Sequence, residues 1–99
     1  MADDNEYVKE EVWKDYHAGD SIEGIIVDIL HNVGQYNSTL YKFHSDDDKF
    51  IAVWGSTDIN KKMQKLEVSI GMRVKITYNG LIRTENARDM KDFTVEIID

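Results

Sequence analysis

The chain has 99 residues, a net charge of −7 and no cysteine. That length suits one domain with a core of modest size. The lack of cysteine excludes disulfides, thiol catalysis and cysteine-ligated zinc or iron–sulfur sites, and it fits a reducing compartment. No apolar run approaches the roughly 20 residues of a membrane-spanning helix. The acidic start MADDNEYVKEEVWK has neither the basic nor the apolar part of a signal peptide, so we expect a cytoplasmic protein without membrane contact.

The charges are unevenly distributed along the chain. Residues 1–20 contain seven acidic residues and two lysines, a net charge of −5, whereas residues 56–91 contain eight cationic and four acidic residues, a net charge of +4. The protein is therefore expected to be polarised, and a phosphate group responds to the local field at a site. Removal of residues 1–16 would change the net charge by +4 and is expected to strengthen binding of an anion.

The first half of the chain predicts three strands. Residues 19–30 (GDSIEGIIVDIL) are rich in Ile and Val and indicate a long strand, in which Gly24 suggests a bulge or bend. Residues 39–44 alternate apolar and polar side chains, residues 45–49 (SDDDK) form a polar turn, and residues 50–55 (FIAVWG) are apolar. The second and third strands therefore form a hairpin.

A short helix is predicted over residues 57–66. Ser56, Thr57 and Asp58 are candidate N-caps, and Ile59, Met63 and Leu66 recur at the spacing of one helical face.

Two further strands complete the expected fold. Residues 72–78 (MRVKITY) alternate cleanly, and residues 93–98 (FTVEII) alternate to the end. Residues 79–92 between them read as a long polar connection, with strand extensions at its ends as an open alternative. Residues 5–16 are expected to form a short helix against the rest.

Three strands, a helix and two strands is the element order of the OB-fold, an all-β, five-stranded and partly open barrel. It binds oligonucleotides or oligosaccharides through its second and third strands and its 1–2 and 4–5 loops. We expect residues 19–99 to form this domain and residues 1–18 an acidic extension. An SH3-type barrel is the structural alternative, although it usually lacks a helix at this position. The stretch GQYNST (34–39) then becomes the 1–2 loop, and residues 79–91 become the 4–5 loop.

The chain also resembles the small OB-fold single-stranded DNA-binding proteins encoded by phages. The resemblance lies in GDSIEG, GQYNSTLY, AVWGST, SIGMRVKITYNG and KDFTVEI, in this order over residues 19–98. It implies coating of single-stranded DNA during replication or recombination in a host cell. The chain departs from the family in two respects: no acidic C-terminal tail for partner recruitment is expected, and the 4–5 loop is nearly as acidic as it is basic.

Exposed aromatic rings are the first candidates for a binding site, because stacking contributes roughly 1–3 kcal/mol per base. We expect Tyr41 and Phe43 in the core, which leaves Phe50 and Trp54 on the outer face. Packing of Trp54 under the helix is the alternative, and Tyr36 could equally be a loop-packing ring. The candidate nucleic-acid-binding residues are Tyr36, Lys42, Phe50, Trp54, Arg73, Lys75, Arg83, Arg88 and Lys91.

No catalytic or metal-binding pattern is found in the sequence. The run Asp46-Asp47-Asp48 lacks the glycine and downstream glutamate of a calcium loop, so we interpret it as a turn. The three histidines are scattered, and we expect neither an enzyme nor a cofactor. The expected function is single-stranded nucleic-acid binding, with DNA preferred over RNA on the resemblance. The alternative is a phage-encoded protein-binding OB module that engages a host or replication protein through its acidic surface.

Overall fold

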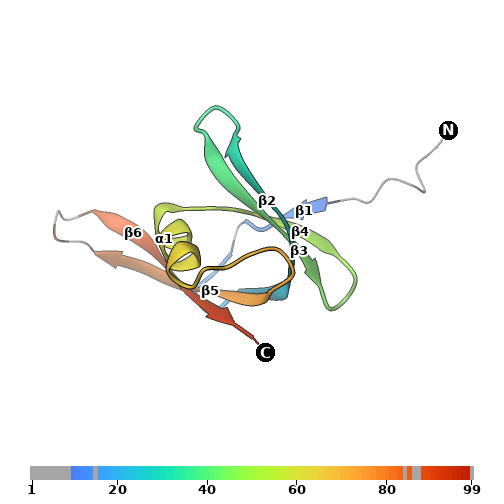
Figure 1. Ribbon diagram of the computed structural model, residues 1–99. Helices are drawn as coiled ribbons and strands as arrows, with labels where there is room; N and C mark the ends of the chain where they lie inside the picture. The colour runs from blue at the N-terminus through green and yellow to red at the C-terminus, as the bar shows by residue number, and fades with distance from the viewer. Residues whose placement is uncertain (1–9, 15, 84, 86–87, 99) are drawn as a thin grey trace.

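The structure, a computed structural model, describes residues 10–14, 16–83, 85 and 88–98 (Figure 1). Its described part is mostly β, with six strands and one short helix, which agrees with the expected all-β fold class. In chain order the elements are β1 (Glu10–Val12), β2 (Ser21–Val33), β3 (Ser38–Ser45), β4 (Phe50–Trp54), α1 (Thr57–Lys65), β5 (Arg73–Arg83) and β6 (Asp89–Ile97). The polar connection expected over residues 79–92 is therefore largely a β5–β6 hairpin.

The six strands form one sheet in the order β1-β4-β3-β2-β5-β6. All neighbouring pairs are antiparallel except β1 and β4, which are parallel. The expected five-stranded OB-fold barrel is wrong in two respects. A sixth strand is present, and among the described residues β4 and β6 do not pair, so the sheet stays open.

β2 is the long strand that serves two parts of the sheet. Its first five residues pair with β5, and residues 24–33 pair with β3. A Cβ on Gly24 would lie 2.5 Å from the backbone oxygen of His44, so glycine allows the close approach of β3 at this point. The bulge expected at Gly24 is displaced, because the register shifts follow Ile26 and Leu30.

The helix expected over residues 5–16 is wrong where the structure describes this segment. Glu10–Val12 is a strand, and the N–H of Trp13 donates to the backbone oxygen of Ala52 at 2.9 Å. The free edge of β4 offers unpaired N–H and C=O groups, which an extended segment satisfies and a helix does not. Residues 5–9 and 15 lie outside the described residues.

The single described helix, α1, begins and packs as its sequence predicts. The Ser56 Oγ accepts a hydrogen bond from the N–H of Ile59 at 3.2 Å. Ile59 and Met63 are buried, whereas Leu66, the third residue of the expected apolar face, is the exposed C-cap. The helix is nine residues long, and no helix among the described residues is long and apolar enough to cross a membrane.

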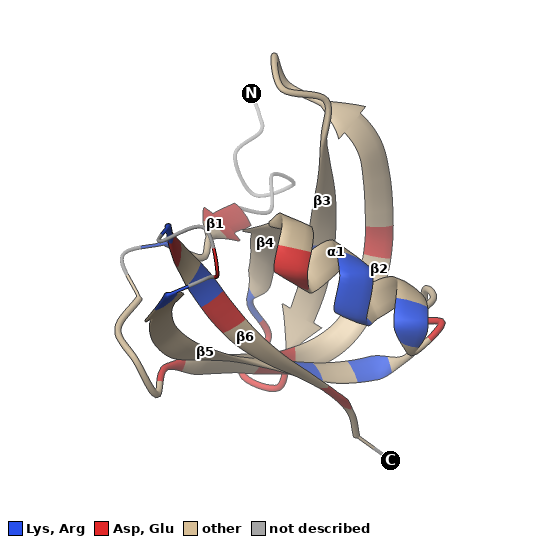
Figure 2. Cartoon of the chain, turned by 90° about the vertical axis from the view of Figure 1, so that its left-hand side faces the viewer, with Lys and Arg blue, Asp and Glu red and all other residues tan. Residues whose placement is uncertain are grey.

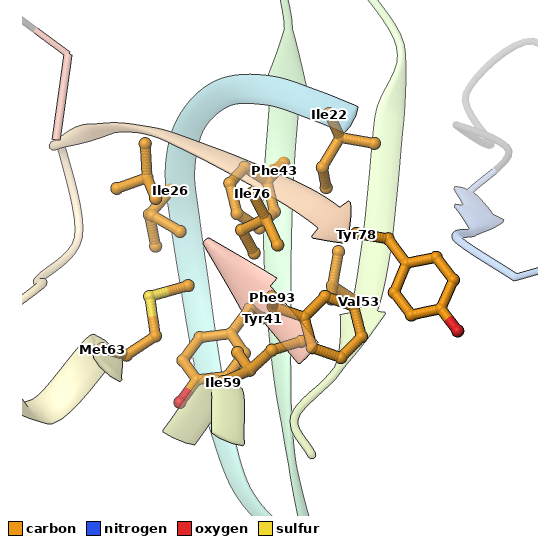
Figure 3. Close-up of a cluster of buried hydrophobic side chains, with 11 residues drawn as sticks. Ile22, Ile26, Tyr41, Phe43, Val53, Ile59, Met63, Ile76, Tyr78 and Phe93 are labelled. Carbon is orange, nitrogen blue, oxygen red and sulfur yellow. The ribbon is translucent and has the colours of Figure 1, made fainter. Parts of the chain in front are cut away.

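The core lies between the inner face of the sheet and α1 (Figure 3). Tyr41, Phe43 and Val53 are buried as expected, and Ile51 packs against them. The buried cluster comprises Ile22, Ile26, Tyr41, Phe43, Val53, Ile59, Met63, Val74, Ile76, Tyr78 and Phe93. The alternation of residues 72–78 is therefore that of a strand with one face in the core.

Side chains of α1 occupy the edge of β6 where a closing strand would pair. The Asp58 carboxylate accepts a hydrogen bond from the N–H of Phe93 at 2.9 Å, and the Lys62 Nζ donates to the backbone oxygen of Phe93. Lys62 and Asp58 are themselves 3.0 Å apart. The helix thus satisfies backbone groups of β6 in place of a neighbouring strand.

Aromatic rings from the segment after β1 fill the remaining gap between β4 and β6. The ring centroids of Trp13 and Tyr16 are 4.3 Å apart, and the Tyr16 ring lies 4.7 Å from Tyr78 and 5.7 Å from Phe93. The N–H of Gly19 then donates to the backbone oxygen of Tyr78 at 2.7 Å. This segment therefore crosses from the edge of β4 to β5 and covers the open side of the core.

Candidate nucleic-acid interface

The β2–β3 hairpin presents Tyr36 at its tip. The turn residues Gly34 and Asn37 have positive φ angles of 76° and 51°, and the N–H of Asn37 donates to the Gly34 oxygen at 3.2 Å. Asparagine and glycine tolerate this backbone region better than other residues. Tyr36 lies between them with 82% of its surface exposed, so its ring is not packed against the loop.

Trp54 ends β4 close to this tip. It is 44% exposed, which excludes the alternative in which it packs under α1. Together with Tyr36, it lines a hollow of about 310 Å³ beside the turn. Two aromatic residues that are 18 positions apart in the sequence are therefore brought to one concave surface. Exposed rings in such a place can stack on bases.

A second hollow, of about 550 Å³, also borders Trp54. It is lined by Val12, Trp13, Lys14, Tyr16, Val53, Trp54 and Lys91. Sequence reasoning missed Trp13, Lys14 and Tyr16 because it treated the N-terminal residues as an acidic extension. The signal was the pair of rings in WKDY, which a purely solvated acidic segment does not need. We call this second hollow the Trp13 hollow.

Phe50 and Lys42 lie on the expected outer face, but each already has a neighbour. The Phe50 ring stacks on His44, with centroids 4.7 Å apart and planes at 25°. The Nζ of Lys42 lies 3.3 Å from the Oε2 of Glu10. Phe50 is also roughly 13 Å along β4 from Trp54 at the usual rise per residue. The stacked rings of Phe50 and His44 therefore form a separate group from Trp54.

Arg73 and Lys75 are on β5 and line neither hollow. The guanidinium of Arg73 is 2.7 Å from the Asp46 carboxylate and 3.6 Å from that of Glu23. The hydrogen bond to Asp46 raises the pKa of Arg73 above its ordinary value. Lys75 is half-buried, and its strand partners are Glu23 and Glu96. Arg73 is therefore paired with the chain's own carboxylates, and Lys75 lies between two strands that carry glutamates at the facing positions.

The acidic turn after β3 places its carboxylates beside cationic or hydrogen-bonding groups of the same chain. Asp46 binds Arg73, and the Asp48 Oδ1 lies 2.7 Å from the Nε2 of His44. The hydrogen bond from Ser45 lowers the pKa of Asp47. No group of three or more His, Asp or Glu residues in the described ranges is arranged to hold a metal ion.

The β5–β6 hairpin carries the last three candidate cations. Arg83 is 72% exposed with Asp89 at 3.9 Å, and Arg88 is exposed. Lys91 is exposed too, and its Nζ lies 5.1 Å from the centroid of the Tyr16 ring. Of these three, Lys91 lines a hollow shared with Trp54. Figure 2 shows further cationic bands along α1 and acidic residues on β1.

Comparison with known proteins gives no identification. The chain matches no protein-family model, no curated protein and no solved structure. Its function must therefore be inferred from the arrangement of its own residues.

Proposed function

We propose that the protein binds single-stranded nucleic acid without an enzymatic step. The observation that supports this most strongly is the placement of two exposed rings, Tyr36 and Trp54, along one hollow beside the turn of the protruding β2–β3 hairpin. Base–ring stacking is tolerant of sequence, because every base has a flat π face. A path over these rings therefore suits a strand of any sequence.

The arrangement is consistent with an open relative of the OB-fold. β2, β3 and β4 follow the order of its first three strands, α1 lies at the expected point, and β5 and β6 form the last hairpin. In that fold a strand of nucleic acid crosses the second and third strands between the 1–2 and 4–5 loops. Here these positions belong to β3, β4 and the two protruding hairpins visible in Figure 1.

The proposed ligand is single-stranded DNA, which the protein would bind during phage-type replication or recombination inside a host cell. This preference rests on the resemblance to phage single-stranded DNA-binding proteins. The sugar of RNA differs by one hydroxyl, which a protein senses only through contacts at that group. Stacking on Tyr36 and Trp54 alone would accept both nucleic acids, so discrimination must come from other groups along the strand.

Binding is expected to be moderate in strength. Many of the chain's cations are paired with its own carboxylates, including Lys42, Lys62 and Arg73. Few phosphates can then be neutralised, and log K should fall with log salt by only about 0.7 for each phosphate contacted.

The proposal is tested with fluorescein-labelled oligo-dT in an anisotropy titration across a salt series, with duplex DNA and oligo-U as competitors. We expect saturable binding in the micromolar range, a salt slope corresponding to about one to three phosphates, and weak competition by duplex. Absence of binding at low salt, or equal competition by duplex, would contradict the proposal.

A protein partner is the second candidate function. The β5–β6 hairpin exposes Leu81 and Ile82, at 60% and 46%, and β1 exposes Glu10 and Glu11. Exposed apolar side chains on a protruding hairpin, with carboxylates elsewhere, suit a protein surface. This function is favoured if oligo-dT does not bind and a host protein is retained by the full chain but not by its Leu81→Ser/Ile82→Ser variant.

A further inference from the structure

A backbone hydrogen bond and a ring contact hold Trp13 at the Trp13 hollow. The N–H of Trp13 is bonded to Ala52 of β4, and the Trp13 ring lies against Tyr16 with centroids 4.3 Å apart. One side of the indole is therefore supported, while Trp13 also lines the hollow together with Trp54. A volume of about 550 Å³ lies within the range of small-ligand sites, roughly 300–1,000 Å³.

The charged residues that line this hollow are positive, whereas the net charge of the chain is negative. Both charged residues that line it, Lys14 and Lys91, are cations, although the chain as a whole carries −7. Neither forms an ion pair with any residue that the structure describes, whereas Lys42, Lys62 and Arg73 all do. A hollow that combines aromatic rings with lysines lacking an ion pair among the described residues is complementary to a base and its phosphates.

The role of this segment in covering the core does not explain why both Lys14 and Lys91 line the hollow. The position of Lys91 over the Tyr16 ring is explained by a cation–π contact. Lys14 has no such contact among the described residues, and it is exposed at the rim of the hollow. A ligand with negative charge on both sides of an aromatic group would meet both cations.

We propose that the Trp13 hollow is a second nucleotide subsite, an inference that rests on the proposed function. One base lies against Trp13 and Trp54, and the phosphates on either side of it meet Lys14 and Lys91. Because Trp54 borders both hollows, the strand passes from Tyr36 over Trp54 into this subsite. The segment after β1 is then part of the binding surface as well as a cover for the core.

The first arm of the test compares two double variants with the same loss of charge. Lys14→Gln/Lys91→Gln removes the cations of the subsite, and Lys61→Gln/Lys65→Gln removes two exposed lysines of α1. Oligo-dT affinity is measured for each across a salt series. We expect the slope of log K against log salt to become shallower by about 1.4 in the first variant, which corresponds to two phosphate contacts, and to stay unchanged in the second.

The second arm uses Trp13 as the reporter. Trp54→Phe leaves Trp13 as the sole tryptophan and keeps a ring at position 54. We expect its fluorescence to change on addition of oligo-dT with the midpoint seen by anisotropy. If this variant no longer binds oligo-dT, the comparison of the two double lysine variants alone decides whether the subsite exists.

The outcomes separate the two proposals. Oligo-dT binding with equal slopes for both lysine pairs and a constant Trp13 signal overturns the subsite and leaves the proposed function standing. Equal slopes alone overturn the subsite if Trp54→Phe does not bind. Absence of binding by the unaltered protein overturns both.

Discussion

Lys42 and Glu10 form an ion pair across β4, with their Nζ and Oε2 atoms 3.3 Å apart. Glu10 reaches this position because β1 pairs in parallel with β4, next to Phe50. Lys42 is one of the cations expected from the sequence to meet a phosphate on the outer face. The first described residue of the chain therefore already neutralises it.

Replacement of Glu10 by Gln should release Lys42 for a phosphate. We expect tighter binding of oligo-dT at low salt and a salt slope steeper by up to about 0.7. Anisotropy titrations at several salt concentrations measure both quantities. Glu67→Gln is the control, because it makes the same change of charge at an exposed residue after α1. Equal gains in both variants would mean that net charge, and not the ion pair, limits binding.

Two truncations should have opposite effects. Removal of residues 1–9 deletes three acidic residues and one lysine, a change of +2, and takes away no described contact. It should strengthen binding at low salt. Removal of residues 1–16 changes the charge by +4, and charge alone would predict the larger gain.

The structure reverses that second expectation, because the longer deletion removes Trp13 and Tyr16 from the open side of the core. We expect a loss of roughly 2–5 kcal/mol in the free energy of unfolding, together with weaker binding. Urea denaturation and oligo-dT titration of both truncations measure this. A longer deletion that is as stable as the shorter one would contradict the covering role of these rings.

Asp58→Ala should destabilise the protein by more than the loss of a surface charge. It leaves the N–H of Phe93 without its acceptor and Lys62 without its closest carboxylate. The expected cost is about 1–3 kcal/mol in the free energy of unfolding, measured with urea. Lys61→Ala, at an exposed position of the same helix, should cost less than about 0.5 kcal/mol. Similar losses of unfolding free energy in the two variants would show that the contacts of Asp58 with β6 do not stabilise the fold.

Periodicity and capping were sufficient to predict the local elements. The alternation of residues 72–78 and the inward side of Tyr41 and Phe43 are confirmed. Of the three candidate N-caps, the structure selects Ser56. The outward position of Trp54 follows from the same strand register. Such features depend on neighbours within a few residues or on the next strand, and the sequence displays them directly.

The open sheet could not be predicted in the same way. It depends on contacts of Asp58 and Lys62 with Phe93, which lie 35 and 31 residues apart in the chain. β1 has three residues, too few to display a period of two. The pairing of Arg73 with Asp46, 27 residues away, likewise removed a candidate phosphate contact that composition alone suggested.

Alkaline pH should reveal the burial of Tyr41. Burial raises the pKa of its phenol above the ordinary value of 10.0, and the hydroxyl donates to Asn60 at 2.8 Å. The folded protein therefore favours the neutral phenol, so this contribution to stability is complete below pH 10.0 and is lost as the pH rises through the folded pKa.

Tyr41→Phe should be less stable near neutral pH, by about 1 kcal/mol for the lost hydrogen bond. Its melting temperature should fall less steeply than that of the unaltered protein as the pH rises above 10.0. Thermal melts at several pH values compare the two. Parallel curves would contradict a titrating role for Tyr41.

The affinity of Trp54→Ala for oligo-dT, per folded molecule, tests the central claim most directly. Because Trp54 is 44% exposed and borders both hollows, its loss should weaken binding by about 1–3 kcal/mol, roughly 5- to 150-fold. Trp54→Phe, which keeps a ring, should retain most of the affinity, and the melting temperature of both variants should change little. If Trp54→Ala binds as tightly as the unaltered protein but melts several degrees lower, Trp54 has a packing role and the proposed surface does not bind the strand.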